Sequence, residues 1–462
     1  MHDATHTHTL AAHIAASRFE DLPAHVVEHA KLLVLDTLGV AIYGATLPWC
    51  DRLRATAKSM EAPGKSTVWG TSQGYSAPTA AMVNATATHA FELDDVGPGG
   101  HNGSVTLSSA LAIAQHTGRL SGKDLINAVV VGIETAARIG NCVGRVPHEG
   151  LGFHNPGLLG SFASVASAGR SHALGADDMV HALGHAGQQA ASLMFTHHGG
   201  MGKRLLAGQA ARAGTFGTLL AANGFTNADN VFEAEYGGFC AAHTGNRRPP
   251  LYDLTAINRD WGSHYFTPSV RFKMWATRVP NHASLEGIRA LRRQRNFQAD
   301  EVKELRIRLG KGYIQNVAWA YTPTTITSAQ LNLYFVAAVM LLENDVFIDQ
   351  FTEQAIADPK VLAMIERISI THDASLDGKQ YDHGNPVEVT LNDGTVLSGW
   401  GMVRGGPENP TTRADVVEKF GKLTSRVLDA KVRSRLIERC DALETLEDAT
   451  ALIEGIESAR LS

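Results

Sequence analysis

The sequence predicts a mainly α-helical protein that carries a smaller α+β domain. Much of residues 1–267 is rich in Ala, Gly and Ser, with apolar residues every three to four positions, which is typical of closely packed helices. Residues 268–400 contain segments in which apolar and charged residues alternate, as in strands. We therefore expect a large all-helical domain built from both chain ends, residues 1–267 and 401–462, with an α+β lid domain, residues 268–400, inserted between them.

The helices of the first part are marked by their start and stop signals. Asp21 and Pro23 begin a helical pattern that runs through Val27 to Gly44, and proline is favoured in a first helical turn. Three more helices are predicted over 104–118, 159–175 and 203–224. Each is dense in small residues and ends at a glycine, so close helix crossings are expected.

The second part contains strands. Residues 302–309 and 387–391 alternate apolar with charged or polar residues, and Asp393-Gly394 is a hairpin turn signal before 395–397. Between these strands, residues 329–342 form a continuous apolar run that predicts a buried helix. Residues 415–461 predict amphipathic helices that rejoin the first bundle.

The composition fits a globular protein that binds small molecules. Hydrophobic residues make up 44% of the chain, and 41 Lys and Arg nearly balance 46 Asp and Glu. There is no basic run of the kind that binds nucleic acid, and no stretch reaches the roughly 18 uninterrupted apolar residues of a membrane span. The four cysteines lie far apart, which predicts a reduced, cytoplasmic protein without a close-spaced metal or redox motif.

Several common motifs are absent. The sequence contains no Gly-x-Gly-x-x-Gly after a strand, no His-Glu-x-x-His and no Gly-x-Ser-x-Gly. The glycines before Lys203 resemble a phosphate loop only superficially, because His197 stands where its first glycine belongs and Arg204 where it needs Ser or Thr. Nucleotide binding, zinc proteolysis and serine hydrolysis are therefore disfavoured.

The clearest candidate for chemistry is the segment 89–104, which places carboxylates and imidazoles around a Gly/Pro loop before a helix. It contains Glu92, Asp94, Asp95 and His101. Clustered carboxylates raise one another's pKa and histidine titrates near neutrality, so the segment suits proton transfer. The alternative is structural: the aspartates cap helices and the histidine fills a polar core position.

Other candidates are scattered along the chain. His154 lies in a Gly/Pro-rich loop, and Lys203 with Arg204 opens a helix whose amides favour anions. Lys273 lies in the basic stretch before His282, and Tyr334 lies within an apolar helix where its hydroxyl needs a partner. Each has an ordinary structural explanation by itself.

Taken together and in order, these segments resemble the MmgE/PrpD family over nearly the whole chain. The residues that carry the resemblance are the acidic loop ending in His101, Gly152–His154, Lys203–Gly208, Tyr236–Phe239, His282, Pro323-Thr324 with Tyr334, and Arg404–Pro410 with Lys419-Phe420. The family includes 2-methylcitrate dehydratase, cis-aconitate decarboxylase and iminodisuccinate epimerase. The resemblance implies a helical domain with an α+β lid, a homodimer, and no cofactor or metal.

The resemblance also implies roles for particular residues. The family's active-site residues correspond to His101, His154, His282, Lys203 and Tyr334. With the acidic-loop carboxylates Glu92 and Asp94 these form the expected catalytic set. Arg204 and Lys273, as further cations, and Asp95 are expected to bind the substrate. The acidic loop reads Glu-Leu-Asp-Asp-Val from residue 92, where the family pattern reads Asp-Phe-Asp-Asp-Thr, so the substrate stays open.

We expect a cofactor-independent lyase that abstracts a proton α to a carboxylate of a small di- or tricarboxylate. A reaction of the 2-methylcitrate dehydratase type leads. The alternatives are an epimerase acting on iminodisuccinate, a decarboxylase acting on cis-aconitate, and a metal- or ligand-binding protein without catalysis, since 21 histidines is a high count.

Overall fold

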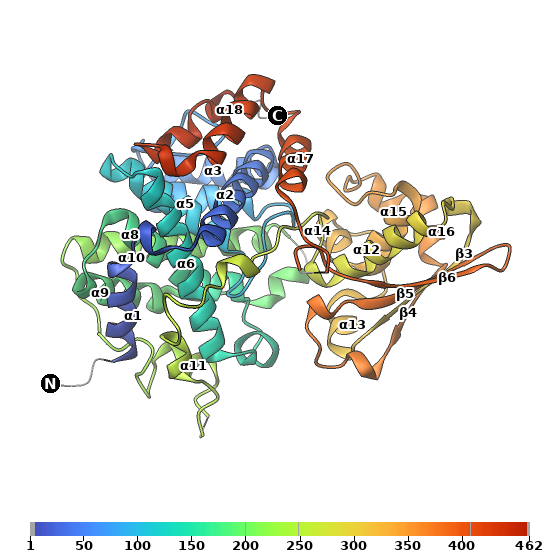
Figure 1. The fold of residues 1–462 in the computed structure, drawn as a ribbon, viewed down its shortest axis with the longest axis horizontal. Helices are drawn as coiled ribbons and strands as arrows, with labels where there is room; N and C mark the ends of the chain where they lie inside the picture. Colours follow the sequence, from blue (N-terminus) through green and yellow to red (C-terminus); the bar gives the residue numbers. More distant parts are fainter. Residues whose placement is uncertain (1–4, 199, 248, 407, 460–462) are drawn as a thin grey trace.

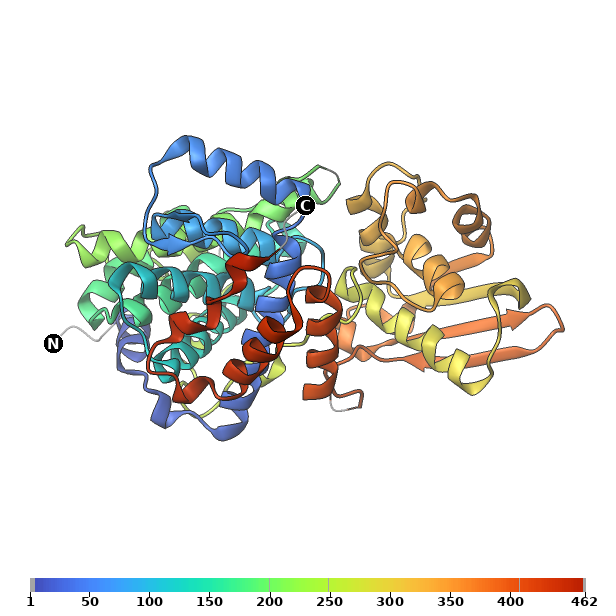
Figure 2. The ribbon, with the colours of Figure 1, turned by 90° about the horizontal axis from the view of Figure 1, so that it is seen from above.

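The computed structural model describes residues 5–198, 200–247, 249–406 and 408–459. Figure 1 shows a helical body beside a smaller lobe that contains the main sheet, and Figure 2 shows the same two lobes from above. The mainly helical class with an α+β part is therefore confirmed. The domain limits at 267/268 and 400/401 stay predictions.

Helices form most of the body. They are α1 (His6–Ala16), α2 (Ala24–Gly44), α3 (Pro48–Met60), α4 (Ala77–Thr88), α5 (Asn102–Thr117), α6 (Gly122–Val143), α7 (Asn155–Leu158), α8 (Gly160–His172), α9 (Ala176–Gln189), α10 (Gly202–Ala222) and α11 (Phe239–His243). A short antiparallel pair, β1 (Ser66–Thr67) and β2 (Gly74–Tyr75), precedes α4. The predicted helices 104–118, 159–175 and 203–224 correspond to α5, α8 and α10.

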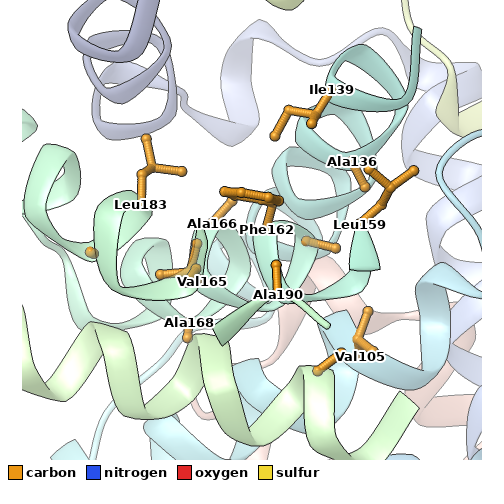
Figure 3. Packing of buried hydrophobic residues seen from close by; sticks show 14 of the residues in the cluster. Val105, Ala136, Ile139, Leu159, Phe162, Val165, Ala166, Ala168, Leu183 and Ala190 are labelled. Atoms are coloured by element: carbon orange, nitrogen blue, oxygen red, sulfur yellow. The ribbon is translucent and has the colours of Figure 1, made fainter. Parts of the chain in front are cut away.

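The body core is built around α8, which packs against α5, α6 and α10. Figure 3 shows Phe162 of α8 among aliphatic side chains from neighbouring helices. Small residues allow these close contacts: a Cβ at Gly214 of α10 would lie 2.4 Å from the backbone nitrogen of Val165. The small-residue pattern in the sequence therefore reports helix crossings, as expected.

Helix α6 is long and apolar enough to cross a membrane, but in this fold it is a core helix. Of its most apolar 18-residue window, 89% is buried inside the protein, where α6 packs against α8 and α5. Its apolar surface is thus covered by other helices of the body.

The second lobe is a four-stranded mixed sheet covered by helices. The strand order is β4 (Ile368–His372), β3 (Val302–Leu309), β5 (Asn385–Leu391) and β6 (Val396–Gly401); β3 is parallel to β4 and antiparallel to β5. From Leu305 to Leu309 alternate residues of β3 are buried, as the period-two pattern predicted. The alternation is broken near Val302, where the pairing with β5 is irregular. Helix α12 (Val279–Gln294) packs on β5 and β6, and α15 (Leu333–Glu343) packs on α12 and on α16 (Pro359–Ile365). Helix α13 (Lys311–Val317) contacts β4.

Two features of this lobe differ from the sequence predictions. The helix expected over 329–342 is divided into α14 (Ile326–Leu331) and α15, because the Asn332 side chain accepts a hydrogen bond from the Phe335 amide and caps the second helix. Strand β4 was not predicted; it is short and is defined by its pairing with β3.

The chain end returns to the body, as predicted. Helices α17 (Arg413–Thr424) and α18 (Ala430–Asp441) pack against α2. Lys419 of α17 forms a buried ion pair with Asp36 of α2 at 2.7 Å and also donates to the Leu93 carbonyl. Through Lys419, the C-terminal segment therefore connects the acidic loop to α2.

Candidate active site

A cavity of about 730 Å³ lies between the body and the second lobe. The body contributes residues from three segments, which are the α4–α5 loop, the α6–α7 loop, and the segment from Met194 to Lys203; the second lobe contributes residues 273–280, 310–316 and 376–381. Five Lys and Arg side chains line it against two carboxylates, with four imidazoles. Such a cavity favours a small anionic ligand.

Backbone pairing brings the site segments together. Val96 and Arg271 exchange two backbone hydrogen bonds of 2.8 Å, which places Lys273 beside the acidic loop. The His154 amide donates to the Ser192 carbonyl at 3.1 Å, and the Met194 amide donates to the Gly152 carbonyl at 2.9 Å. These pairings lie in loops, where sequence periodicity carries no information.

Glu92 is the centre of a buried ion cluster. Its carboxylate contacts the Lys203 ammonium, accepts from Arg204 Nη1 at 3.0 Å, and lies 3.4 Å from Lys273 Nζ. Glu92 adopts φ = +58°. A positive φ is uncommon for residues other than glycine and often marks a functional position. The turn directs this carboxylate at three cations.

Arg204 extends the cluster to the second lobe. Its Nη2 atom donates to Gln330 Oε1 at 2.6 Å and Thr327 Oγ1 at 3.2 Å, both on α14. The guanidinium is 1% exposed and does not line the cavity. It therefore holds Glu92 and the two lobes together.

Asp94 holds two histidines. Its Oδ2 atom lies 2.6 Å from His89 Nδ1 and 3.1 Å from His101 Nδ1, and its Oδ1 accepts from Lys273 at 3.2 Å. His101 Nδ1 also lies 2.7 Å from the Asp95 carbonyl oxygen. Because a carbonyl only accepts, Nδ1 carries the hydrogen, and Nε2 of a neutral His101 is left as a base.

His101 is the member of this group that lines the cavity. Asp94 is fully buried behind it. Burial alone would raise the pKa of Asp94, but the charges of His101, Lys273 and His89 outweigh burial and hold the pKa well below its usual value. An ionised Asp94 orients the His101 ring through its contact with Nδ1.

Asp95 has a different place. It caps α5, with Oδ2 accepting from the Asn102 amide at 2.8 Å and Oδ1 from the Gly103 amide at 2.9 Å. Burial, and then the charge of Asp94, raise the pKa of Asp95 to about 7. It does not line the cavity, so its contacts match the capping alternative considered from the sequence.

Burial lowers the pKa of both cavity lysines, but nearby charges add to this effect at Lys203 and oppose it at Lys273. Burial, followed by the charges of Arg204 and Lys273, lowers the pKa of Lys203 well below its usual value. Burial also lowers the pKa of Lys273, although the nearby Asp94 opposes this. Both ammonium groups line the cavity and gain from an anionic ligand, which would replace lost hydration.

His154 also lines the cavity and is 4% exposed. Its ring is 6.2 Å from the His89 ring and 4.6 Å from the His197 ring, centroid to centroid. Burial and the neighbouring imidazoles lower the pKa of His154 well below its usual value. A neutral His154 can donate one hydrogen bond to a ligand.

The structure does not bring His282 and Tyr334 to the cavity wall. His282 is buried in the first turn of α12, where Nε2 lies 3.2 Å from the Thr277 carbonyl oxygen. Burial and the charge of Lys273 lower the pKa of His282 to about 3. Tyr334 packs against the apolar core of the second lobe.

Other cavity residues were missed by the sequence analysis. They are Arg145, His148, His197, Arg278, Tyr313 and Lys379. Each comes from a loop or helix end without a recognisable motif. Two of them had a sequence signal: Arg278 lies five residues after Lys273 in the basic stretch before His282, and His148 lies in the same Gly/Pro-rich loop as His154.

Three potential metal ligands, His89, Asp94 and His101, have atoms within 4.8 Å of one another. The residues present do not suit a cation, because Lys273 already binds the same carboxylate at 3.2 Å and Lys203 adds a second buried ammonium group nearby. Nδ1 of both histidines points at Asp94 as a hydrogen-bond donor. Asp94 and the two histidines are therefore joined by hydrogen bonds to one another rather than arranged as metal ligands.

A helical body, an α+β lobe and a cationic cavity between them define a two-lobed protein with a site for a small anion. The sequence profile of the MmgE/PrpD N-terminal domain matches residues 8–251, and that of the C-terminal domain matches residues 275–443. The chain belongs to the MmgE/PrpD family, and it is a lyase of that type.

Several curated relatives match along almost their full lengths. A cis-aconitate decarboxylase-like protein of Aspergillus oryzae is 30% identical over 451 residues, which is 94% of this chain and 93% of the relative. The cis-aconitate decarboxylase of Aspergillus terreus is 29% identical over 453 residues, with 94% and 92% covered. The human cis-aconitate decarboxylase is 26% identical over 467 residues, with 96% and 93% covered.

Proposed function

We propose that this enzyme decarboxylates cis-aconitate or a closely similar unsaturated tricarboxylate. The observation that carries the proposal is the cavity itself, in which Arg145, Lys203, Lys273, Arg278 and Lys379 face a single space together with His101. This charge suits a substrate with several carboxylates. The relatives named above add support for decarboxylation over the dehydration that led the sequence analysis.

The proposed reaction is the loss of carbon dioxide with an allylic shift of the double bond, followed by protonation of carbon. The bond between the allylic methylene carbon and its carboxylate breaks, carbon dioxide leaves, and the pair forms a methylidene double bond. The former double bond then places its electrons on the vinyl carbon, which takes a proton. The product is methylidenesuccinate, so the enzyme must stabilise a transient carbanion and deliver one proton.

His101 is assigned to proton delivery. Its Nδ1 faces the Asp95 carbonyl at 2.7 Å and Asp94 Oδ2 at 3.1 Å. These contacts orient the ring so that Nε2, when it carries a proton, can donate that proton to carbon. Lys203 and Lys273 stabilise the developing charge, and Arg278 holds a spectator carboxylate. Burial lowers the pKa of Arg278 to about 10, which leaves it charged at neutral pH.

Proton NMR in D₂O tests the proposal with cis-aconitate, 2-methylcitrate and iminodisuccinate in parallel. The expected result is a pair of methylidene signals from cis-aconitate, one deuterium in the product methylene, and release of labelled carbon dioxide from carboxyl-labelled substrate. Loss of the methine signal of 2-methylcitrate, with collapse of its methyl doublet to a singlet, would instead establish a dehydratase. Uptake of α-deuterium without elimination would establish an epimerase. Unchanged cis-aconitate contradicts the proposal.

We further propose that the enzyme is a cytoplasmic homodimer. Leu193, Phe195 and Met201 are exposed large apolar residues in one short segment, and apolar patches of this kind commonly mark subunit contacts. Light scattering after size-exclusion chromatography should give twice the chain mass of 49.4 kDa. A mass equal to one chain contradicts the dimer.

A further inference from the structure

His197 has no role in the reaction outlined above, yet it faces the same cavity. It lies in the 3-10 helix η3 (Met194–His198), is 8% exposed and lines the cavity wall. Neither ring nitrogen has a hydrogen-bond partner among the residues that the structure describes. A buried polar group left without a partner costs roughly 1–3 kcal/mol, so this position favours a ligand that accepts a hydrogen bond.

The surroundings of His197 indicate the charge of that ligand. Its ring packs edge-on against His154, with centroids 4.6 Å apart and planes at 65°, and His154 Nδ1 is also buried without a partner in the described part of the chain. The charge of Arg278 and the imidazole of His148 act on His197 electrostatically. Two imidazole donors beside a guanidinium suit a carboxylate.

Helix η3 lies where the two lobes meet. Helix η3 contacts α14 of the second lobe as well as α10 of the body, and Arg278 comes from the second lobe at the start of α12. A carboxylate held by His197 and Arg278 would therefore contact both lobes.

We propose that His197, His154 and Arg278 form a second carboxylate subsite in the same cavity as Lys203 and Lys273. This inference rests on the proposed function, since it assigns a place to a second carboxylate of the substrate. Burial and the charge of Arg278 lower the pKa of His197 to about 2, so its imidazole is neutral and offers one N–H. Its tautomer is not held by any described residue, so the ligand selects the donor nitrogen.

The test compares binding of propane-1,2,3-tricarboxylate by calorimetry to the wild-type enzyme and three variants. His197→Phe keeps a ring against His154 but removes both nitrogens, and His197→Asn keeps one amide donor. His116→Asn is the matched control, because His116 is exposed in the last turn of α5, outside the cavity lining.

We expect His197→Phe to weaken binding about 10-fold to 100-fold, the range for a hydrogen bond to a charged group. His197→Asn should lose less, and His116→Asn should bind as the wild type does. In turnover with cis-aconitate, His197→Phe should raise KM at least tenfold and change kcat by less than about threefold. Without ligand, its unfolding temperature should equal or exceed that of the wild type, because an unpartnered polar group is removed.

The outcomes separate this inference from the proposed function. If wild-type and His197→Phe enzymes bind the tricarboxylate equally well, the subsite is wrong and the proposed function stands. If the wild-type enzyme neither binds the tricarboxylate nor converts cis-aconitate, both are wrong. If His197→Phe lowers kcat while KM is unchanged, His197 acts in chemistry and the binding role is overturned.

Discussion

Replacing Glu92 by Gln tests the central electrostatic feature of the site. The substitution keeps the shape of the side chain but removes the negative charge that contacts Lys203, Arg204 and Lys273. Glu92 is 2% exposed, and the three cations are 1–2% exposed. Removing one partner from a buried ion cluster leaves uncompensated charge and typically costs about 3–5 kcal/mol.

Urea unfolding followed by circular dichroism measures this loss. The matched control is Glu149→Gln, because Glu149 also pairs with an arginine but both side chains are 50% exposed; such a pair contributes less than about 1 kcal/mol. We also expect a polycarboxylate to restore part of the stability of Glu92→Gln, since the ligand supplies the missing negative charge.

The pH dependence gives a second check. Burial already lowers the pKa of Lys203, and loss of Glu92 lowers this pKa further. Between that lowered pKa and the unfolded value of about 10.4, the unfolded chain binds more protons, so stability rises with pH. This rise should begin at a lower pH and be larger in Glu92→Gln. A variant within 1 kcal/mol of the wild type at pH 7, with an unchanged pH profile, would refute the charge-cluster reasoning.

Three further predictions concern the acidic loop. His101→Asn should lower kcat about 10²-fold to 10⁴-fold in the NMR assay, whereas His116→Asn, in the helix that follows His101, should not. Equal activities of the wild-type and His101→Asn enzymes would exclude His101 as the proton donor. The raised pKa of Asp95, about 7, means that the folded state holds a proton that the unfolded chain releases above about pH 4. Stability should therefore fall by up to about 4 kcal/mol from pH 4 to 7, and an unchanged slope in Asp95→Asn would contradict this. Gly100 adopts φ = +127°, and a Cβ there would lie 3.0 Å from the Pro156 backbone. Gly100→Ala should therefore lower the stability by about 1–3 kcal/mol and abolish most of the turnover. Gly118→Ala is the control: Gly118 has φ = +82° and open space around it, so the substitution should lower stability without affecting turnover.

The fold was largely predictable because its signals are local. Helices α2, α5, α8 and α10 and strand β3 follow from the spacing of apolar residues within each segment. One failure was local: Asn332 divides a helix by capping its second half. The other was not local, because β4 is defined by its pairing with the distant strand β3 rather than by its own pattern.

The candidate site was predictable only in its parts. Glu92, His101, His154, Lys203 and Lys273 were expected, and all five line the cavity. No sequence signal placed Arg204 behind Glu92 rather than in the cavity. The cap that Asp95 forms on α5 was considered from the sequence as the structural alternative to a substrate-binding role.

The sequence by itself determined the class of fold, the family resemblance and the residue types that carry acid–base chemistry, because these depend on short-range spacing and motifs. Only the tertiary structure decided which groups share one space. Lys273 meets Asp94 across 179 residues, and Arg204 meets Gln330 across 126. Such contacts, and the cation excess they create in the cavity, arise from the packing of two lobes, and no local pattern encodes that packing.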